Sequence, residues 1–448
     1  MPTLTITDFS CIREASFTIA PVTVIIGPQG SGKSVTTKLT YFFADILSNF
    51  VQAAERGDNV EAFKSHLNKV FSIWFPPSAW GQGRFNITYT AGPFYVRLLR
   101  RTIKGKLSDV VAVTFSEWFT DFYEETRRLF DKAATTRDAE LDNDPNVSLA
   151  LDRAWRLREV VADRIARSLR KEFLAQQTFI PAGRAFFTSI GRLVAGFEQA
   201  GSLDPVTVKF ARLFANLKDR HGRYSTSRLQ RLGPDFMQRR SKVMGDLFGG
   251  EIKFEDEVEY VQTSDGRKVP FSFLSSGQQE LLPMWSLIDY FNEVDALRIG
   301  ASTNSKTART WWDLVYIEEP EAHLFPSAQS LLMEFLIGSI RADRSRTRQR
   351  SLILTTHSPY IMSKLNVFLK AGQLAKRKKR NQDINEVVPR ECWLADGQLA
   401  AYAIENGRMR ELLDDEGLID STYLDQISED ISRDFSALLS IEAEVASL

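Results

Sequence analysis

The chain has 448 residues with 57 basic and 57 acidic side chains, so its formal net charge is zero. Its two cysteines, Cys11 and Cys392, lie far apart, which excludes a disulfide framework and favours a reducing, cytoplasmic setting. No apolar run reaches the ~18 residues that would cross a bilayer, and the first ten residues are too polar for a signal peptide. We therefore expect a globular protein without a membrane contact, and the length suggests about three structural units.

The first elements predict an α/β arrangement. Residues 3–9 alternate apolar and polar side chains, and residues 22–26 form a nearly continuous apolar run, typical of a strand covered on both faces. A glycine-rich turn follows at once, and the apolar residues after it recur at helical spacing. Strands and helices alternate again near the other end of the chain, so we expect one α/β domain.

The middle of the chain reads as an insertion that returns to the same sheet. Short strands between 80 and 118 predict an antiparallel region, and residues 119–178 and 188–247 have mostly helical periodicity. Two hairpins are predicted later, with turns at Asp265-Gly266 and Asp396-Gly397. The last forty residues look acidic and helical.

The glycine-rich turn matches the pattern G-x-x-x-x-G-K-[ST] between a buried strand and a helix. Its residues are Gly27, Pro28, Gln29, Gly30, Ser31, Gly32, Lys33 and Ser34, with Val35 beginning the helix. Glycines let backbone N–H groups surround phosphates, and the helix N-terminus faces the same charge. Lys33 would reach the β- and γ-phosphates of ATP, and Ser34 would be a ligand of Mg²⁺. The alternative, a glycine-rich turn with an incidental lysine, is much weaker in this context.

A second apolar strand, at 314–317, ends in Glu318 and Glu319. In a nucleotide site the first carboxylate holds Mg²⁺ and the second polarises a water for attack on the γ-phosphate. Strands also end in acidic turns without any such role, but the upstream phosphate loop favours the functional interpretation. We assign no catalytic role to Glu321, which follows Pro320 in the next loop.

Two further features could contact phosphate. Ser275, Ser276, Gly277 and Gln278 lie where a hairpin meets a helix, and this sequence suits a second phosphate site. The alternative is a helix cap in which Ser276 and Gln279 form a capping box. His357 follows a buried strand and could donate to a γ-phosphate, although by itself it could equally be a hydrogen-bonded loop histidine.

Along the chain, the phosphate loop is followed by a long insertion, then the Ser-Gly turn, the acidic pair and His357, and in this order the four motifs resemble the core of the ATP-binding-cassette (ABC) ATPases. More narrowly, EEPEAHLFP and TTHSPYI resemble the soluble RecF/SMC/OLD-like group, often labelled AAA-type ATPases of prokaryotic defence systems. The resemblance covers about 1–50 and 250–365. It implies an α/β P-loop NTPase of ABC type with an antiparallel β subdomain and a large, mostly helical insertion. It also implies ATP and Mg²⁺ as ligands.

The resemblance assigns roles to individual residues. Lys33, Glu319 and His357 would act on ATP, the last as the switch histidine, while Ser34 and Glu318 would hold the metal. Ser275 and Gly277 would act across a homodimer or higher oligomer, on nucleotide held by the partner. The sequence departs from the family at Ser276, which replaces the first glycine of LSGGQ, and at Glu318, which is Asp in transporters.

The glutamine that normally links Mg²⁺ to the helical lobe is hard to place. The candidates are Gln176, Gln177 and the FIPAGR segment around Arg184. With the resemblance, we divide the chain into five segments: an ATPase lobe at 1–60, an antiparallel β subdomain at 61–118, a mainly helical insertion at 119–247, an ATPase core at 248–400 and an acidic helical tail at 401–448.

The leading functional hypothesis is an ATP-hydrolysing switch that closes as a head-to-head dimer. By family analogy it would control a separately encoded effector, a nuclease or toxin in anti-phage defence. The alternatives are a RecF-like DNA-repair ATPase and an ATP-stabilised scaffold with little hydrolysis. Three arginine- or lysine-rich runs, at 153–170, 341–350 and 376–380, could contact nucleic acid without sequence preference, but most such runs are solvated faces.

Overall fold

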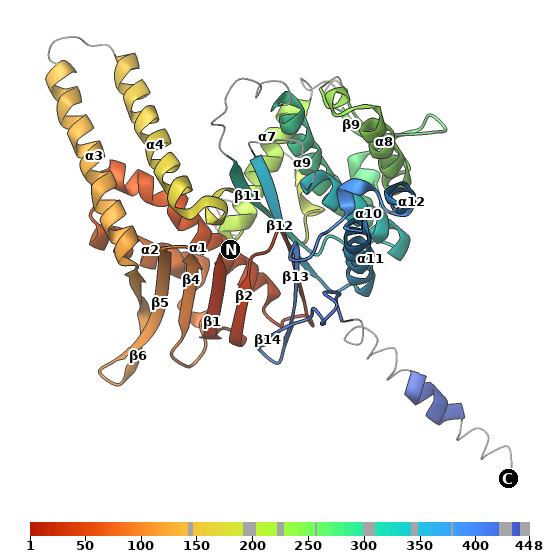
Figure 1. The fold of residues 1–448 in the computed structure, drawn as a ribbon, viewed down its shortest axis with the longest axis horizontal. Coiled ribbons are helices and arrows are strands. Elements are labelled where there is room, and N and C mark those ends of the chain that lie inside the picture. Colours follow the sequence, from red (N-terminus) through yellow and green to blue (C-terminus); the bar gives the residue numbers. More distant parts are fainter. Residues whose placement is uncertain are drawn as a thin grey trace.

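The computed structural model describes residues 1–141, 147–190, 203–221, 228–255, 258–298, 310–341, 348–377, 380–420 and 432–439. Within them, one eleven-stranded sheet runs through the molecule in the order β6-β5-β4-β1-β2-β14-β13-β3-β12-β11-β7 (Figure 1). Its strands are β1 Thr3–Phe9, β2 Ile12–Thr18, β3 Val22–Ile26, β4 Asn86–Ala91, β5 Phe94–Ile103, β6 Lys106–Phe115, β7 Leu174–Ile180, β11 Trp311–Glu318, β12 Arg348–Thr356, β13 Leu399–Glu405 and β14 Arg408–Glu411. A separate small sheet contains β8 Gly250–Glu255, β9 Val258–Thr263 and β10 Lys268–Pro270.

Helices cover both faces of the large sheet. They are α1 Lys33–Glu55, α2 Val60–Trp74, α3 Glu117–Leu141, α4 Val147–Leu169, α5 Phe186–Ile190, α7 Pro205–His221, α8 Pro234–Phe248, α9 Ser276–Arg298, α10 Pro326–Ile340, α11 Pro359–Ala375 and α12 Asn381–Val387. Short 3₁₀ turns are η1 Pro77–Ala79, η2 Arg170–Glu172, η4 Leu229–Leu232, η5 Phe271–Phe273 and η6 Arg390–Cys392. The α3–α4 pair projects from the body as an antiparallel arm (Figure 1).

The sheet has an antiparallel half and a parallel half. β6, β5, β4, β1 and β2 are antiparallel neighbours, whereas β13, β3, β12, β11 and β7 are parallel. The hairpin strand β14 joins the halves by pairing with both β13 and β2. The expected insertion does return to the same sheet, because β4 pairs with β1 and β7 pairs with β11.

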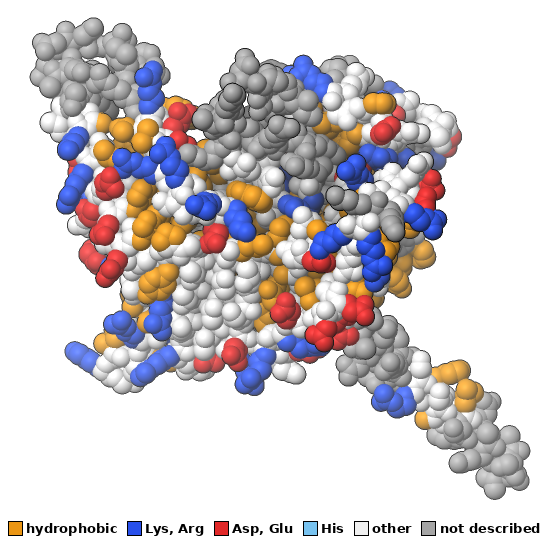
Figure 2. Space-filling view, viewed as in Figure 1, with side chains coloured by type: hydrophobic (Ala, Val, Ile, Leu, Met, Phe, Trp, Pro, Cys, Tyr) orange, Lys and Arg blue, Asp and Glu red, His pale blue; other side chains and the backbone are white. Residues whose placement is uncertain are grey.

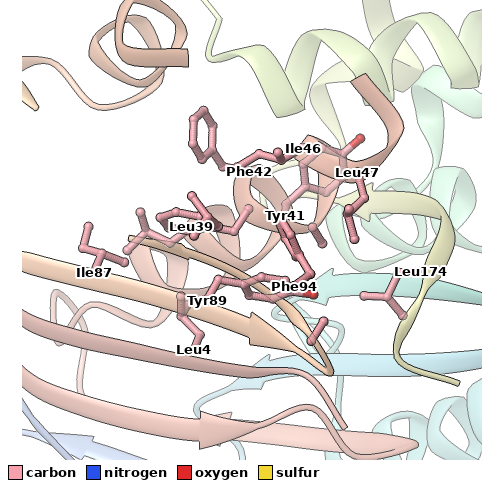
Figure 3. Packing of buried hydrophobic residues seen from close by; sticks show 14 of the residues in the cluster. Leu4, Leu39, Tyr41, Phe42, Ile46, Leu47, Ile87, Tyr89, Phe94 and Leu174 are labelled. Carbon is pink, nitrogen blue, oxygen red and sulfur yellow. The ribbon is translucent and has the colours of Figure 1, made fainter. Parts of the chain in front are cut away.

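The central parallel strands β3, β11 and β12 are buried on both faces over most of their length, as the sequence predicted. In β3, Val22, Val24 and Ile26 belong to one hydrophobic cluster and Ile25 to the other. The cluster that contains Ile25 lies under α1 and includes Tyr41 and Tyr89 (Figure 3). Because side chains alternate along a strand, one continuous apolar run serves two cores.

Three expectations about elements are corrected. Residues 401–411 lie in β13 and β14 rather than in a helical tail; in 401–448 the described helix is 432–439. The late hairpin turns at Asn406-Gly407, both with positive φ, and not at Asp396-Gly397. Residues 61–74 of the expected β segment lie in α2, and Asn59 caps the N-terminus of this helix by accepting from the Ala62 N–H. The turn at Asp265-Gly266 is confirmed, since β9 pairs with β10 around it.

Helix α9 carries four buried carboxylates. Asp289 receives two hydrogen bonds from Arg240, and Asp295 receives two from Arg350. Glu280 faces Arg184, as described below. Burial, reinforced by neighbouring Asp289, raises the pKa of Glu293 to about 7.

We predict that Glu293→Gln stabilises the protein above neutral pH. The folded-state pKa lies above the unfolded value, so this carboxyl favours folding at low pH and increasingly opposes it as pH rises from about 4.5 through 7. The amide cannot ionise, so at pH 8 the variant should gain about 1–3 kcal/mol over the wild type. Urea unfolding at pH 5 and pH 8 measures this difference. An equal effect at both values would contradict the assignment.

Candidate functional site

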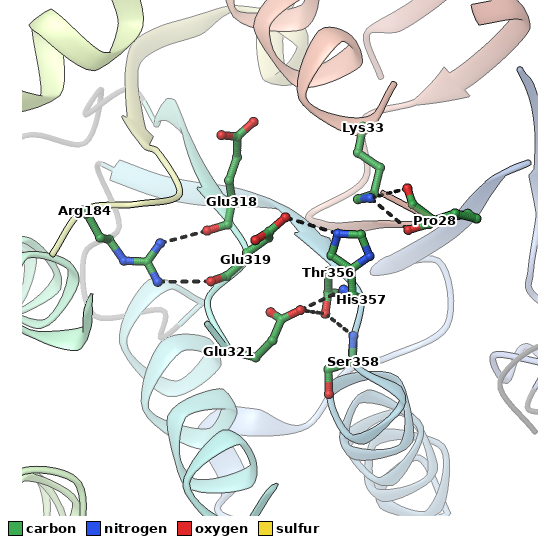
Figure 4. Close-up of polar contacts among 10 residues, drawn as sticks. Pro28, Lys33, Arg184, Glu318, Glu319, Glu321, Thr356, His357 and Ser358 are labelled. Carbon is green, nitrogen blue, oxygen red and sulfur yellow. Dashed lines mark hydrogen bonds and ion pairs between the residues drawn. The ribbon is translucent and has the colours of Figure 1, made fainter. Parts of the chain in front are cut away.

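Strand register brings the motif residues to one edge of the parallel sheet. Ile26 of β3 pairs with Thr356 of β12, and Thr355 pairs with Glu318 of β11. The next residues along these strands are Gly27, His357 and Glu319. Because the carboxyl ends of parallel strands meet at one edge, the phosphate loop, the acidic pair and the histidine converge (Figure 4).

The phosphate loop has a glycine that the fold requires. A Cβ on Gly27 would lie 2.5 Å from the Ile404 carbonyl oxygen and 2.7 Å from Ser31 Oγ. Gly30 and Gly32 have φ of +74° and +107°, which glycine adopts without strain. Ser31 Oγ is buried and has no hydrogen-bond partner among the described residues. The loop therefore offers a buried polar atom to a ligand, as a phosphate-binding loop needs.

Lys33 lies folded against its own loop. Its ammonium donates to the carbonyl oxygens of Gly27 and Pro28, at 2.8 and 3.0 Å (Figure 4). Burial lowers the pKa of Lys33, and the negative charges of Glu319, Glu321 and Glu318 oppose that shift. A cation held by weak neutral acceptors in a buried site is suited to binding an anion there.

Glu318 lies beside the phosphate-loop helix. It is 5% exposed, and its Oε1 accepts a hydrogen bond from Thr37 Oγ1 at 3.2 Å. Thr37 lies one turn after Ser34 on α1. The Ser34 side chain is exposed. The candidate metal ligands Ser34 and Glu318 thus approach from two elements, and the sequence did not indicate Thr37 as their neighbour.

Glu319 has a left-handed backbone conformation with φ of +44°, which costs a non-glycine residue about 1 kcal/mol. Its N–H donates to the Thr355 carbonyl at 2.9 Å, and its Oε1 lies 3.1 Å from Nε2 of His357. Both side chains are about a third exposed, at 39% and 36%. The carboxylate is therefore reachable from solvent and oriented by the histidine (Figure 4).

Glu321, to which we assigned no catalytic role, also lies at this site. Its Oε1 accepts from Thr356 Oγ1 at 2.6 Å and from the His357 N–H at 2.7 Å. Its Oε2 is buried and has no hydrogen-bond partner in the described part of the chain. Glu321 thus fixes the backbone that carries His357. A possible signal was its position two residues after Glu319, with Pro320 forcing a turn between them.

The Ser-Gly turn caps helix α9, as the second interpretation of its sequence proposed. Helix α9 has a capping box, but it consists of Ser275 and Gln278 rather than Ser276 and Gln279. Ser275 Oγ accepts from the Gln278 N–H, and Gln278 Oε1 accepts from the Ser275 N–H. A Cβ on Gly277 would lie 2.6 Å from the His323 carbonyl oxygen, so glycine lets α9 pack on the acidic loop. Ser275 and Ser276 remain exposed.

Neither Gln176 nor Gln177 reaches the acidic edge. Gln177 accepts from the Tyr316 hydroxyl at 2.6 Å, and Gln176 accepts from Arg348 at 2.8 Å, so both brace the sheet. Arg184 does reach it, through the carbonyl oxygens of Glu318 and Glu319.

The basic runs mostly form ion pairs within the chain. Arg348 pairs with Asp313, and Arg350 is buried against Asp295. On the arm, Arg158, Arg164 and Arg167 pair with Glu55, Glu125 and Asp163, respectively. Arg344, Arg346, Lys378, Lys379 and the side chain of Arg153 lie outside the described residues. On the face in Figure 2, basic and acidic side chains are interspersed.

This fold and this convergence of motifs define a P-loop NTPase of ABC type. A family model described as "AAA domain, putative AbiEii toxin, Type IV TA system" matches residues 116–363, more than half of the chain. The chain therefore belongs to this AAA-domain family, whose matched region contains the Ser-Gly turn, the acidic pair and His357.

Two solved structures are similar over most of the chain. One is the SMC head domain from Thermotoga maritima, with 13% identity, a TM-score of 0.32 and coverage of 91% of this chain and 97% of that chain. The other is an SMC head bound to the C-terminal winged-helix domain of ScpA, with 10% identity, a TM-score of 0.33 and coverage of 91% and 96%. The search of curated proteins found no match.

The chemistry of the site fits a nucleotide with Mg²⁺. Lys33 and the backbone N–H groups of the loop supply positive charge, Ser31 Oγ is available, and Ser34 and Glu318 offer the oxygen ligands that Mg²⁺ prefers. Within the described residues, no three His, Cys, Asp or Glu side chains form a metal-binding group. In the same part of the chain, no helix has the length and apolar character needed to span a membrane.

We predict that Gly27→Ala weakens nucleotide binding at least about tenfold and destabilises the fold by about 1–3 kcal/mol, because its methyl group would meet the Ile404 carbonyl oxygen. Gly245→Ala is the control: Gly245 is exposed in α8, with no described atom within 4 Å of the added carbon. It should leave binding unchanged and stabilise by about 0.5–1 kcal/mol. Urea unfolding and titration with a fluorescent ATP analogue measure both effects, and unaltered binding by Gly27→Ala would refute the prediction.

Proposed function

We propose that the protein is an ATP-hydrolysing switch that closes head-to-head on ATP and thereby controls a partner. The observation that carries the proposal is the convergence of Lys33, Glu318, Glu319 and His357 at one edge of the sheet. This arrangement supports the proposal because Lys33 could bind phosphate, Glu318 could hold the metal and Glu319 could orient a water around one position.

In this proposal Glu319 orients the attacking water and accepts its proton, and His357 holds the carboxylate in place. Lys33 stabilises charge on the phosphate oxygens as the bond to the γ-phosphorus breaks. Mg²⁺, held by Ser34 and Glu318, would neutralise charge on the phosphates. Gly27–Ser34 would bind the nucleotide phosphates through backbone N–H groups and hold them in one position.

Exposed aromatic residues support closure onto a second copy. Phe186, Phe325 and Tyr360 are 43%, 77% and 52% exposed, and each follows the carboxyl end of one of the adjacent strands β7, β11 and β12. Phe273, which is 79% exposed, lies two residues before Ser275 of the Ser-Gly turn. That turn packs on the loop after β11, because Gly277 lies against the His323 carbonyl oxygen. Large apolar side chains around a polar site are typical of a surface that becomes buried on association. Ser275 and Ser276 would then face the partner's nucleotide.

The partner is proposed to be a separately encoded effector, and the setting anti-phage defence. The description of the matched family names a toxin of a type IV toxin–antitoxin system, which supports this setting. The projecting α3–α4 arm is the proposed place of contact, because it extends from the body and Trp155 on α4 is 64% exposed.

We predict that Glu319→Gln lowers the ATP turnover rate by about 10²–10⁴-fold, because the amide cannot accept the proton. ATP should stay bound and hold the heads closed. Light scattering should therefore give twice the monomer mass with Mg-ATP and the monomer mass with Mg-ADP. A monomer in both states would contradict head-to-head closure, whereas an equal multimer in both would indicate a constitutive scaffold.

We also predict that Phe273→Ser in the Glu319→Gln background weakens ATP-dependent association at least about tenfold, because an exposed anchor is lost. Ile73→Ser is the matched control: Ile73 is also exposed, at 69%, but lies on α2, away from the acidic edge. Binding of ATP to monomers should be unchanged in both. Association that survives Phe273→Ser, or is lost with Ile73→Ser, would place the contact elsewhere.

A further inference from the structure

Arg184 is an unusual residue because its whole side chain is buried. It is 0% exposed and follows β7, the strand next to the acidic strand β11. Arginine is almost never fully buried unless its charge is balanced and its donors are engaged. Burial lowers the pKa of Arg184, and Glu280 is the main opposing charge, with Oε2 at 3.7 Å from Nε. Burying this charge costs free energy, so other interactions of Arg184 must offset that cost.

The hydrogen bonds of Arg184 join three elements. Nε donates to the Glu280 carbonyl oxygen at 2.9 Å, one turn into α9. Nη1 donates to the carbonyl oxygen of Pro181 at 3.0 Å. Figure 4 shows the other two contacts: Nη1 donates to the Glu318 carbonyl oxygen at 2.8 Å, and Nη2 donates to that of Glu319 at 3.1 Å. The Arg184 backbone N–H donates to Glu280 Oε2 at 3.1 Å. All three guanidinium nitrogens are thus engaged with backbone oxygens.

The hydrogen bonds of Arg184 connect the Ser-Gly turn, at the start of α9, to the acidic pair Glu318 and Glu319. Glu280 and Gly277 both lie in the first two turns of α9. The carbonyl oxygens of Glu318 and Glu319, which accept from Arg184, lie at the left-handed turn formed by Glu319. A movement of the N-terminus of α9 must either pull on that turn or break hydrogen bonds to a buried charge. The second alternative costs more than a neutral hydrogen bond, because the charged donor would stay desolvated.

We propose that Arg184 is a positioning residue that couples the start of α9 to the backbone of Glu318 and Glu319. When a partner's nucleotide contacts the Ser275 turn, the guanidinium transmits the position of α9 to the carboxylate of Glu319. Arg184 takes this role through backbone carbonyl oxygens and touches neither nucleotide nor metal. The proposal rests on the proposed function, and it deepens the regulation of that site.

A lysine could not make this connection. The guanidinium is planar and presents its donors in a fixed fork, whereas an ammonium is a compact point donor. One Nζ cannot reach the α9 carbonyl and both strand-end carbonyls as three separate nitrogens do. Arg184→Lys therefore keeps the buried charge and removes the link.

The test compares Arg184→Lys with Arg240→Lys. Arg240 is a suitable control because its side chain is only 13% exposed, packs on the same helix and makes two hydrogen bonds, but to the Asp289 side chain and away from the acidic edge. Both variants should lose thermal stability. At a temperature where each remains folded, Arg184→Lys should lower kcat for ATP about 10–100-fold with KM within about threefold, whereas Arg240→Lys should keep both constants.

Hydrogen exchange supplies a readout that does not need hydrolysis. In the nucleotide-free protein, Arg184→Lys should speed exchange together at 276–282 and 319–324, while Arg240→Lys should leave 319–324 unchanged. Faster exchange in only one of the two segments would overturn the coupling even if turnover fell. A wild type that does not hydrolyse ATP would refute the proposed function, and the exchange result would still decide the coupling. Unchanged kcat in an active Arg184→Lys protein would also overturn the proposal.

Discussion

The parallel pairing of β3 with β12, and of β12 with β11, is the constraint on which the rest of the structure depends. The register sets Gly27, His357 and Glu319 one residue beyond three neighbouring strand ends. A slip of one residue would turn every side chain of a strand to the other face. The two hydrophobic clusters prevent such a slip, because Val24 and Ile25 must face different cores. The packing of the apolar interior thus fixes the geometry of a polar site.

Several energetically unfavourable features meet at that site. Lys33 is buried, Glu319 has a left-handed backbone, and Glu321 Oε2 and Ser31 Oγ have no hydrogen-bond partner among the described residues. Elsewhere along α9, arginines neutralise the buried carboxylates of Asp289 and Asp295. Such concentrated strain and unsatisfied polarity are typical of a site completed by its ligand. We therefore regard the nucleotide, in the proposed function, as the group that completes it.

Much of the fold and site could be predicted from the sequence, because their signals are local. The phosphate loop lies between a strand and a helix, and the acidic pair and His357 each follow an apolar run. The position of β13 was not predictable in this way: it pairs with β3, from the other end of the chain, and local turn signals could not choose between Asp396-Gly397 and Asn406-Gly407. The contacts of Arg184 and Glu321 were not predictable for the same reason, since their partners come from other elements.

The most direct test of the account is complementation between two inactive variants. Lys33→Ala removes the cation proposed to bind phosphate, and Ser275→Glu places a carboxylate where the partner's phosphate is proposed to lie. Each alone should have almost no ATPase activity. Their mixture should regain up to about a quarter of the wild-type rate, because half of the symmetric dimers are mixed and one of their two sites is intact. No recovery in a mixture that still forms dimers would contradict a site shared between two copies.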